Sequence, residues 1–179
     1  MKRLWIAPAL ATALLGGTIG YGVTNGGMEE AKAEFAPTAV LGMTEQSDVE
    51  TVTKEQLASF GGVVVEVEEE RQALGTYVQV KVVTTDGMKE KWNNRTGSWE
   101  RVKAKPSSYR AWDEVTCDAV EAIERAKMYG EGRVTEWELK EKNGRLVYKV
   151  KLKTTMYETK VTLDAVTGDV IQTKKKMRS

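Results

Sequence analysis

The sequence lacks several side chains on which common enzyme chemistry depends. It contains no histidine and a single cysteine, Cys117. Histidine is the commonest general base and metal ligand, so Ser/His/Asp triads, Cys/His dyads and histidine-based zinc sites are excluded. One cysteine cannot form a disulfide within the chain, and a reactive thiol needs a nearby cation or base that the pattern does not place. We therefore expect a passive thiol, no catalytic residue, no metal site and no cofactor.

Carboxylates are the other candidates for chemistry, and they gather in the run Glu66, Glu68, Glu69 and Glu70. A calcium site needs six or more oxygen ligands from a folded loop. Alternation instead places three of these glutamates along one face of a strand, which indicates a solvated face. Paired carboxylates for glycoside hydrolysis are compatible with the residue types, but no feature of the sequence brings two of them into one cleft.

The most specific local motif is the turn Asp164-Ala-Val-Thr-Gly168. Asp164 can accept hydrogen bonds from backbone N–H groups two or three residues on, while Gly168 supplies a positive φ. We interpret Asp164, Thr167 and Gly168 as a structural turn. Ligand binding through Asp164 and Asp169 is the alternative.

Two groups of side chains could contact a partner. Lys174, Lys175 and Lys176 form the one local basic cluster, which could bind anionic wall polymers or lipid headgroups or remain solvated in a frayed tail. Trp92 and Trp99 could form a recognition surface, since tryptophan is enriched at binding hot spots. With 27 basic and 26 acidic residues in the chain, no nucleic-acid partner is expected.

The first 33 residues are typical of an export signal. Positive residues at positions 2 and 3 precede an uncharged stretch from Leu4 to Met28, and Ala31-Lys32-Ala33 follows as a small-x-small cleavage site. We expect cleavage after Ala33, with retention of the segment as an anchor as the alternative. Either outcome makes the protein secreted or cell-envelope associated, and a membrane is involved only if the segment is retained.

The remaining sequence predicts two similar units that follow a linker at residues 34–51. In the second unit, residues 112–173, an apolar face predicts a helix with Thr116 as N-cap and Gly130 as closing residue. Strands alternate on both sides of the hairpin signal Asn143-Gly144. Residues 52–103 repeat the strand pattern after a helix of about two turns, at residues 53–60. We therefore predict an α+β fold of two tandem units, each a helix packed on a small antiparallel sheet, the first helix stunted, and then a basic tail at residues 174–179.

The second unit resembles the PepSY domain family of bacterial exported and membrane proteins. The resemblance depends on the helix at 116–126, the hairpin at 142–148 and the segment 161–170, whose Asp-Ala-x-Thr-Gly-x-Val/Ile ending is its most specific part. The first unit resembles a divergent PepSY copy. The resemblance implies a helix on an antiparallel sheet and no catalytic activity. It also implies partners, because some members are inhibitory propeptides of secreted metalloproteases, and others accompany cell-wall hydrolases or regulate the envelope.

Together these features predict a non-enzymatic exported binding protein that inhibits, chaperones or regulates an extracytoplasmic enzyme such as a protease or cell-wall hydrolase. An exposed sheet edge that accepts a peptide strand, or an exposed aromatic face, would provide the contact. The alternative is an envelope-surface structural protein that binds wall polymer or membrane through its basic tail. Tail binding should collapse as the salt concentration rises, whereas edge pairing should not.

Overall fold

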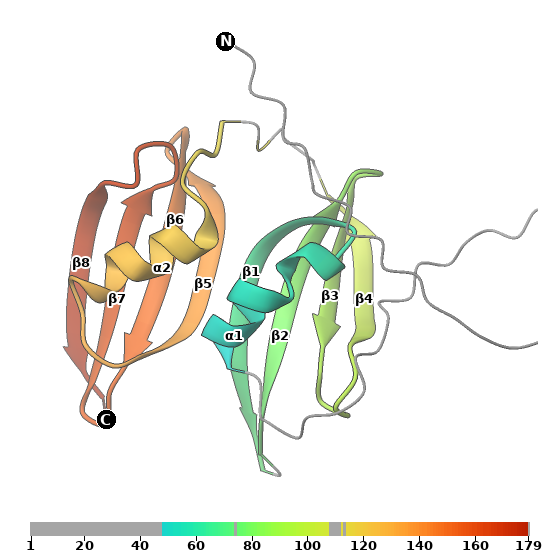
Figure 1. Ribbon diagram of the computed structural model, residues 1–179, viewed down its shortest axis with the longest axis horizontal. Coiled ribbons are helices and arrows are strands. Elements are labelled where there is room, and N and C mark those ends of the chain that lie inside the picture. Colours follow the sequence, from blue (N-terminus) through green and yellow to red (C-terminus); the bar gives the residue numbers. More distant parts are fainter. Residues whose placement is uncertain (1–47, 74, 108–111, 113, 179) are drawn as a thin grey trace, which may run out of the picture. The chain divides into compact units, whose positions relative to one another are not determined.

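The computed structural model describes residues 48–178, apart from 74, 108–111 and 113 (Figure 1). The predicted signal segment, its cleavage site and most of the predicted linker lie outside the described residues. Within the described part, no helix is long and apolar enough to cross a membrane. The helices are α1 (Val49–Glu55), a 3-10 turn η1 (Leu57–Ser59) and α2 (Ala119–Lys127). The strands are β1 (Gly62–Gln72), β2 (Gly75–Thr84), β3 (Met88–Asn93), β4 (Glu100–Pro106), β5 (Arg133–Lys142), β6 (Arg145–Lys153), β7 (Tyr157–Asp164) and β8 (Val170–Met177).

All eight strands belong to one antiparallel sheet in the order β4-β3-β2-β1-β5-β6-β7-β8. The prediction of two tandem units with separate sheets is therefore wrong. The two halves of the sequence meet where β1 pairs with β5, through Glu66 with Glu138, Val67 with Trp137 and Glu68 with Glu136. We call this pairing the β1–β5 junction. Separate sheets would leave the backbone of β1 and β5 unpaired at two additional edges, and the junction satisfies those groups.

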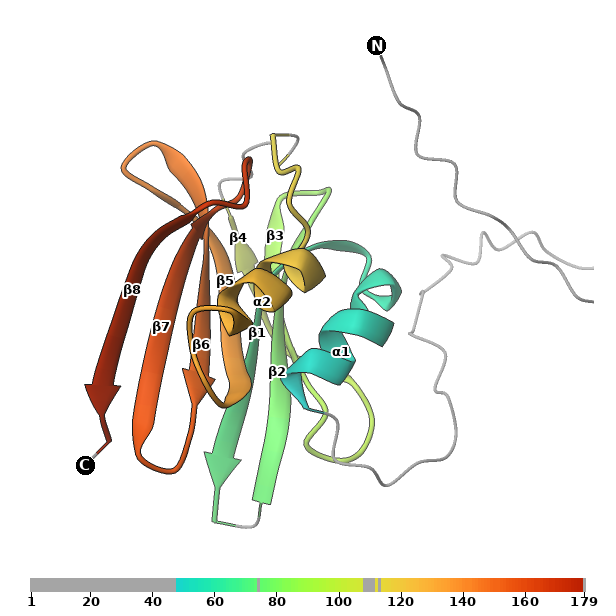
Figure 2. The ribbon, with the colours of Figure 1, turned by 60° about the vertical axis from the view of Figure 1, so that its left-hand side comes forward.

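Both helices pack on the same face of the sheet (Figure 2). Their buried side chains and those of the strands form one hydrophobic cluster that extends across the junction. At its centre lies Trp137, whose side chain is 1% exposed. The indole Nε1–H of Trp137 donates to Oγ1 of Thr53 in α1 at 2.8 Å, and the Thr53 hydroxyl donates to the Val49 carbonyl at 2.6 Å. The first helix is thus anchored to a strand from the second half of the sequence, which two independent units would not allow.

The ends of α2 differ from the prediction. Asp118 is the N-cap, and its carboxylate accepts from the Glu121 N–H at 2.8 Å. The Thr116 hydroxyl instead donates to the Val166 carbonyl. The helix ends at Lys127 with Met128 as its C-cap, so Gly130 lies beyond the helix and does not close it. Asp118 rather than Thr116 is the N-cap because the aspartate carboxylate also interacts favourably with the helix dipole.

The first helix begins earlier than predicted, inside the segment interpreted as a linker at residues 34–51. Asp48 is the N-cap of α1 and accepts from the Thr51 N–H at 2.8 Å. Val49 and Val52 are fully buried. Burial of this apolar face, rather than helix propensity, explains why so short a helix forms here.

The predicted basic tail is also wrong for residues 174–177, because they lie in β8. This strand pairs along β7, with Lys160 opposite Lys174 and Glu158 opposite Lys176. The Lys175 ammonium lies 4.4 Å from the centre of the Tyr157 ring, a cation–π contact. Backbone pairing and these side-chain contacts hold the lysines on the sheet.

Candidate functional site

Strand β8 forms one edge of the sheet and carries backbone groups that no described strand pairs. The Arg178 N–H donates to the Met156 carbonyl at 2.8 Å, across the end of the β7–β8 pair. Hydrogen bonding alternates along an antiparallel pair, so the N–H groups of Lys174 and Lys176 face β7. Those of Thr173 and Lys175 therefore point away from the sheet, where an added strand could accept from them.

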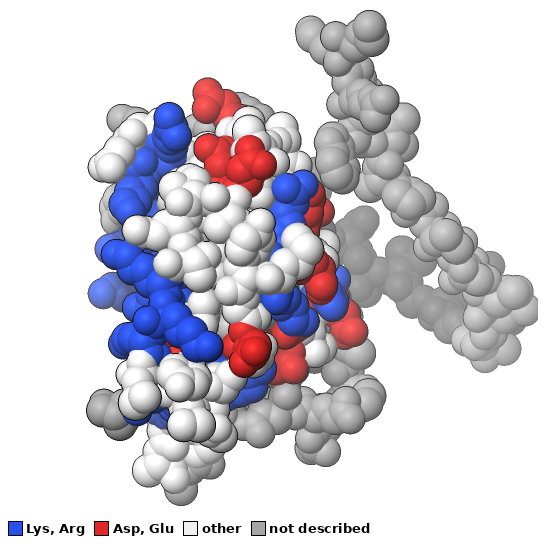
Figure 3. Space-filling view, turned by 90° about the vertical axis from the view of Figure 1, so that its left-hand side faces the viewer, with Lys and Arg blue, Asp and Glu red and all other residues white. Residues whose placement is uncertain are grey.

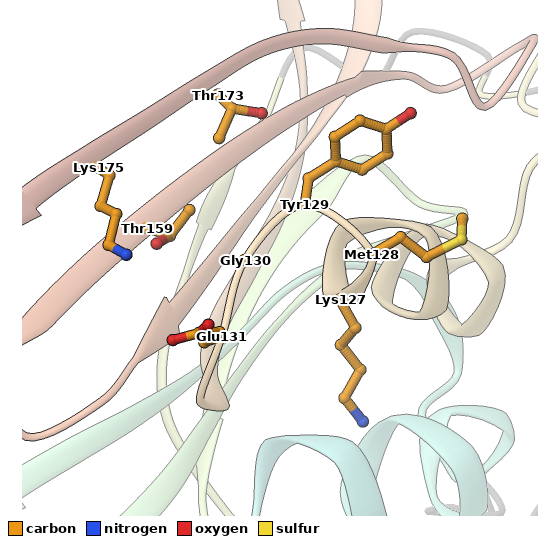
Figure 4. Close-up of a pocket in the computed structure, with 8 residues that line it drawn as sticks. All are labelled: Lys127, Met128, Tyr129, Gly130, Glu131, Thr159, Thr173 and Lys175. Carbon is orange, nitrogen blue, oxygen red and sulfur yellow. The ribbon is translucent and has the colours of Figure 1, made fainter.

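A hollow of about 290 Å³ lies beside this edge, on the helix side of the sheet (Figure 4). Side chains from β7 and β8 form one side of it, and the chain leaving α2 passes across the other. Its lining residues are Lys127, Met128, Tyr129, Gly130, Glu131, Thr159, Thr173 and Lys175. We call it the α2–β8 hollow. No local sequence motif predicts this hollow, because its two sides come from distant parts of the sequence.

The shape of the α2–β8 hollow depends on a close approach between Gly130 and β7. A Cβ atom at Gly130 would lie 2.8 Å from Cγ2 of Thr159 and 3.1 Å from its Cβ. Glycine therefore lets the chain after α2 lie against the sheet. Met128 and Tyr129 next to it remain 74% and 54% exposed. Exposed large apolar side chains beside an open edge provide a contact surface for a partner.

Positive charge surrounds the same edge. Figure 3, which looks onto the β8 side, shows a band of Lys and Arg side chains along the left of the view. Lys127 on the helix side donates to Glu50 at 2.6 Å, and this hydrogen bond raises the pKa of the lysine. Lys174, Lys175 and Lys176 lie along β8 itself, so the edge favours acidic partners.

The turn predicted at Asp164 is held by its own hydrogen bonds. Asp164 Oδ1 accepts from the backbone N–H groups of Val166, at 2.8 Å, and Thr167, at 3.1 Å. Gly168 has φ +74°, and the Thr167 hydroxyl donates to Asp169 Oδ2 at 2.7 Å. Both carboxylates are thus engaged within the turn. The Ala165 carbonyl accepts from the N–H groups of residues 116 and 117, which ties the turn to the start of α2.

Trp92 and Trp99 pack against the hydrophobic cluster rather than forming an open aromatic face. Their rings make edge contacts with Phe60, at 6.0 Å and 5.1 Å between centroids. The Trp99 Nε1–H donates to Gln56 Oε1 at 2.8 Å, and the Trp92 Nε1–H donates to Glu90 Oε2 at 3.0 Å. Both rings are half-buried, so most of their apolar surface serves the core of the first half.

Cys117 lies just before α2 and is 3% exposed. Burial, together with the nearby Glu121 carboxylate, raises the pKa of its thiol to about 11. The thiol is therefore protonated at neutral pH, and the thiolate that nucleophilic chemistry requires is scarce.

Two glutamates of β1, Glu66 and Glu68, take part in the β1–β5 junction, which the sequence did not predict. Glu66 is only 7% exposed and accepts from Lys81 Nζ at 2.5 Å, so it is not on a solvated face. Glu68 lies opposite Glu136. The Glu68 pKa is raised to about 7, first by burial and then by the charges of Glu136, Glu66 and Glu70. Among the described residues, no group of three or more acidic or sulfur side chains is arranged to hold a metal ion. The one sequence feature that could have indicated the pairing of β1 with β5 is the Glu-apolar-Glu pattern that residues 66–68 and 136–138 share.

Comparison with known proteins identifies a family that part of the chain matches. Residues 118–174 match the sequence profile of the PepSY family, described as "Peptidase propeptide and YPEB domain". No curated protein matches the chain significantly. Among solved structures, a crystal structure of a candidate lipoprotein from Clostridium difficile 630 aligns with 16% identity and a TM-score of 0.44, over 73% of this chain and 94% of that one. A score at this level does not establish a common fold. PepSY, the family that the helix, hairpin and turn motifs predict, is therefore confirmed as the family that residues 118–174 match.

Proposed function

We propose that this chain is a non-catalytic, exported binding protein that regulates an extracytoplasmic enzyme, with a peptidase as the first class to test. The observation that carries the proposal is the match of residues 118–174 to a family named for peptidase propeptides. The resemblance of the sequence to exported members of that family supports an extracytoplasmic or cell-envelope location. The protonated, buried Cys117 and the absence of histidine support a role without catalysis.

The β8 edge supplies a physical route for binding. An extended segment of the enzyme would pair with the outward N–H and carbonyl groups of Thr173 and Lys175, as in β-strand addition. Alternate side chains of the added strand would then face the α2–β8 hollow, where Tyr129 and Met128 are exposed. The lysines of β8 favour an acidic segment.

Strand β4 forms the other edge of the sheet, and it is less suited to strand addition. It ends at Pro106, which has no N–H to donate. Its pairing with β3 is interrupted by a register shift between Lys91 and Trp92. Prolines, lysines and irregular pairing all protect edge strands from other chains. Strand β8 also has lysines and a register shift, between Thr162 and Leu163 of β7, so Pro106 is the feature that distinguishes β4.

A proline substitution in β8 tests the route. Lys175→Pro removes an N–H that points away from β7, so pairing within the sheet is kept while strand addition is blocked. Lys175→Ala is the matched control, because it removes the same side chain and keeps the N–H. Each purified protein is immobilised and exposed to the exported proteins of the source organism. Residual peptidase activity is then measured after addition of each protein to the retained enzyme.

We expect the parent chain and Lys175→Ala to retain and inhibit the same exported enzyme, and Lys175→Pro to do neither. Thermal unfolding of the three proteins shows that the variants are folded. Equal retention by Lys175→Pro would refute the edge as the contact. Turnover of a peptide or glycan substrate by the chain itself, lost on substitution of one carboxylate, would refute the non-catalytic role.

The second candidate is an envelope-surface protein that binds wall polymer or membrane through basic residues. It is favoured by the band of positive side chains around β8. Since Lys174, Lys175 and Lys176 lie in a strand, this binding would involve charges held in a fixed row rather than a loose tail. Its salt dependence distinguishes it from edge pairing.

A further inference from the structure

The sheet face opposite the helices carries a second hollow, of about 320 Å³, over β5, β6, β7 and β8. Six lysines and two glutamates provide its charged lining. The lining residues are Glu136, Glu138, Lys140, Lys142, Lys149, Val150, Lys151, Lys160, Thr162, Gln172 and Lys174. We call it the lysine groove. It shares no lining residue with the α2–β8 hollow, but Lys174 belongs to it, so the inference below rests on and deepens the second candidate function, polymer binding through basic residues.

Three of these lysines stand side by side on adjacent strands. Lys151 on β6 pairs in register with Lys160 on β7, and Lys160 pairs with Lys174 on β8. Like charges directly opposite each other destabilise a sheet. A ladder of three lysines is therefore an unfavourable arrangement for the isolated protein, and a bound anion would relieve it.

The acidic residues nearby leave much of this positive charge uncompensated. Glu136 is ion-paired with Lys151, and Glu138 with Lys140. Lys160 shares Glu158 with Lys176, each at 3.4 Å. Lys174 has no ion pair among the described residues.

Lys149 on β6, another lysine that lines the groove, shows the effect of this crowding. It lies opposite Glu138 in the sheet, yet its pKa is lowered, first by contact with Lys140, then by burial, and further by the charges of Lys140 and Lys142. A cation whose charged form is disfavoured by neighbouring cations gains most from an anionic ligand.

We propose that the lysine groove binds a linear polyanion of phosphate groups, which lies across β6, β7 and β8. The lysines follow one another at the spacing of adjacent strands, about 4.8 Å, so they match a repeating row of charges rather than one compact anion. The groove contains no arginine. Lysine ammonium groups bind phosphate as point charges and do not require the planar geometry of a carboxylate partner.

A polymer fits this face better than an anionic membrane does. Glu66, Glu68 and Glu136 lie on the same face, at the β1–β5 junction, and Glu136 itself lines the groove. Glu66 and Glu136 are ion-paired with Lys81 and Lys151, so Glu68 is the carboxylate here without an ion pair among the described residues, and a flat bilayer that reached the lysines would have to lie against it. A polymer chain can follow the lysines and avoid it.

The test measures the affinity of the purified chain for long-chain inorganic polyphosphate by titration calorimetry over a series of salt concentrations. The groove variant combines Lys149→Gln, Lys160→Gln and Lys174→Gln. The charge-matched control combines Lys54→Gln, Lys103→Gln and Lys105→Gln, which lie on α1 and on β4 at the other edge of the sheet. Vesicles that contain phosphatidylglycerol are the second probe, and inorganic phosphate is the third.

We expect the groove variant to lose at least tenfold in affinity for polyphosphate at low salt, with a change of less than about threefold in the control. The slope of log affinity against log salt should become shallower by about 2, at about 0.7 for each lost phosphate contact to a single-stranded polyanion. Inorganic phosphate should bind far more weakly than the polymer. Equal losses in both variants would overturn the proposal, and so would tighter binding to vesicles than to polyphosphate.

Chemical labelling of the parent chain provides a measurement that does not depend on the folding of a variant. Saturating polyphosphate should protect Lys149, Lys160 and Lys174 from acetylation, while Lys54 and Lys127 react at an unchanged rate. Uniform protection of all five lysines, or none, would contradict a site in the groove.

Discussion

Removal of one carboxylate at the β1–β5 junction, by Glu68→Gln, is expected to stabilise the protein above neutral pH. Glu68 is half-buried and lies opposite Glu136, with Glu66 and Glu70 on the same strand. Burial is the largest cause of its raised pKa, the three glutamates add to it, and Lys151 opposes them. The ionised form is thus disfavoured in the folded chain. Glutamine keeps the shape of the side chain without that charge.

The sign follows from proton binding. The pKa of Glu68 is about 7 in the folded chain, against an ordinary value of 4.5. Between these values the folded chain binds more protons than the unfolded chain, so the free energy of unfolding falls as the pH rises. The full difference corresponds to about 3 kcal/mol. Because the side chain is only half-buried and water screens its charge, we expect about 1–2 kcal/mol.

Urea unfolding at about pH 5 and about pH 8 measures the effect. Near pH 5 the protonated Glu68 resembles glutamine, so parent and variant should have similar stability. At pH 8 the variant should be more stable by the amount above. A variant that is no more stable than the parent at pH 8, or that keeps the same dependence on pH between 5 and 8, would refute the reasoning.

Glu69→Gln is the matched control, because its side chain is ion-paired instead of crowded by like charge. Burial would raise the Glu69 pKa, but the hydrogen bonds and charges of Arg133 and then Arg71 outweigh it and lower the pKa. Its contribution to stability is therefore present above its ordinary pKa and lost only as the pH falls through the lowered value. We expect Glu69→Gln to destabilise the protein at both pH values, opposite in sign to Glu68→Gln at pH 8.

Three further predictions concern the core and the turns. Gly132→Ala should lower the free energy of unfolding by about 3 kcal/mol or more, since φ is +103° and a Cβ would overlap a backbone carbonyl of β6. Gly144→Ala should lower it by only about 1 kcal/mol, because φ is +75° but the space around it is open. Chemical denaturation of both variants measures the difference. Thr53→Val should cost about 1–3 kcal/mol because the buried Trp137 N–H loses its acceptor, and the penalty should largely vanish in a Trp137→Phe background. Iodoacetamide should modify Cys117 at pH 7 much more slowly in the folded protein than in denaturant, and equal rates would show that the thiol is not shielded.

Local features of the fold could be predicted from the sequence, because the residues that determine them are neighbours. The hairpin at Asn143-Gly144 and the turn at Asp164 each depend on side chains within a few positions. The apolar spacing from Ala119 to Ala126 likewise predicts α2. Its exact start was missed, because both Thr116 and Asp118 are good N-caps.

The junction and both hollows could not be predicted in this way, because distant segments create them. Glu66 and Glu68 alternate like residues of a solvated strand, and only the approach of β5 buries one and crowds the other. The three consecutive lysines at 174–176 interrupt the alternation of apolar and polar residues that would otherwise predict strand β8. The α2–β8 hollow likewise requires the loop after α2 to lie beside strands that follow much later in the chain.

The order of the strands also determines how this chain can fold. Six of the seven strand pairs in the described sheet join strands that are consecutive in the sequence, so each can form by closure of a local loop. The pairing of β1 with β5 must instead bring together segments that three intervening strands separate, at a larger cost in loop entropy. We expect this pairing to form late and to limit the folding rate, with refolding slower at pH 8 than at pH 5 because like-charged glutamates meet there. The same step would be the first to reverse, so transient opening at β1–β5 would expose two unpaired strands in the middle of the sheet.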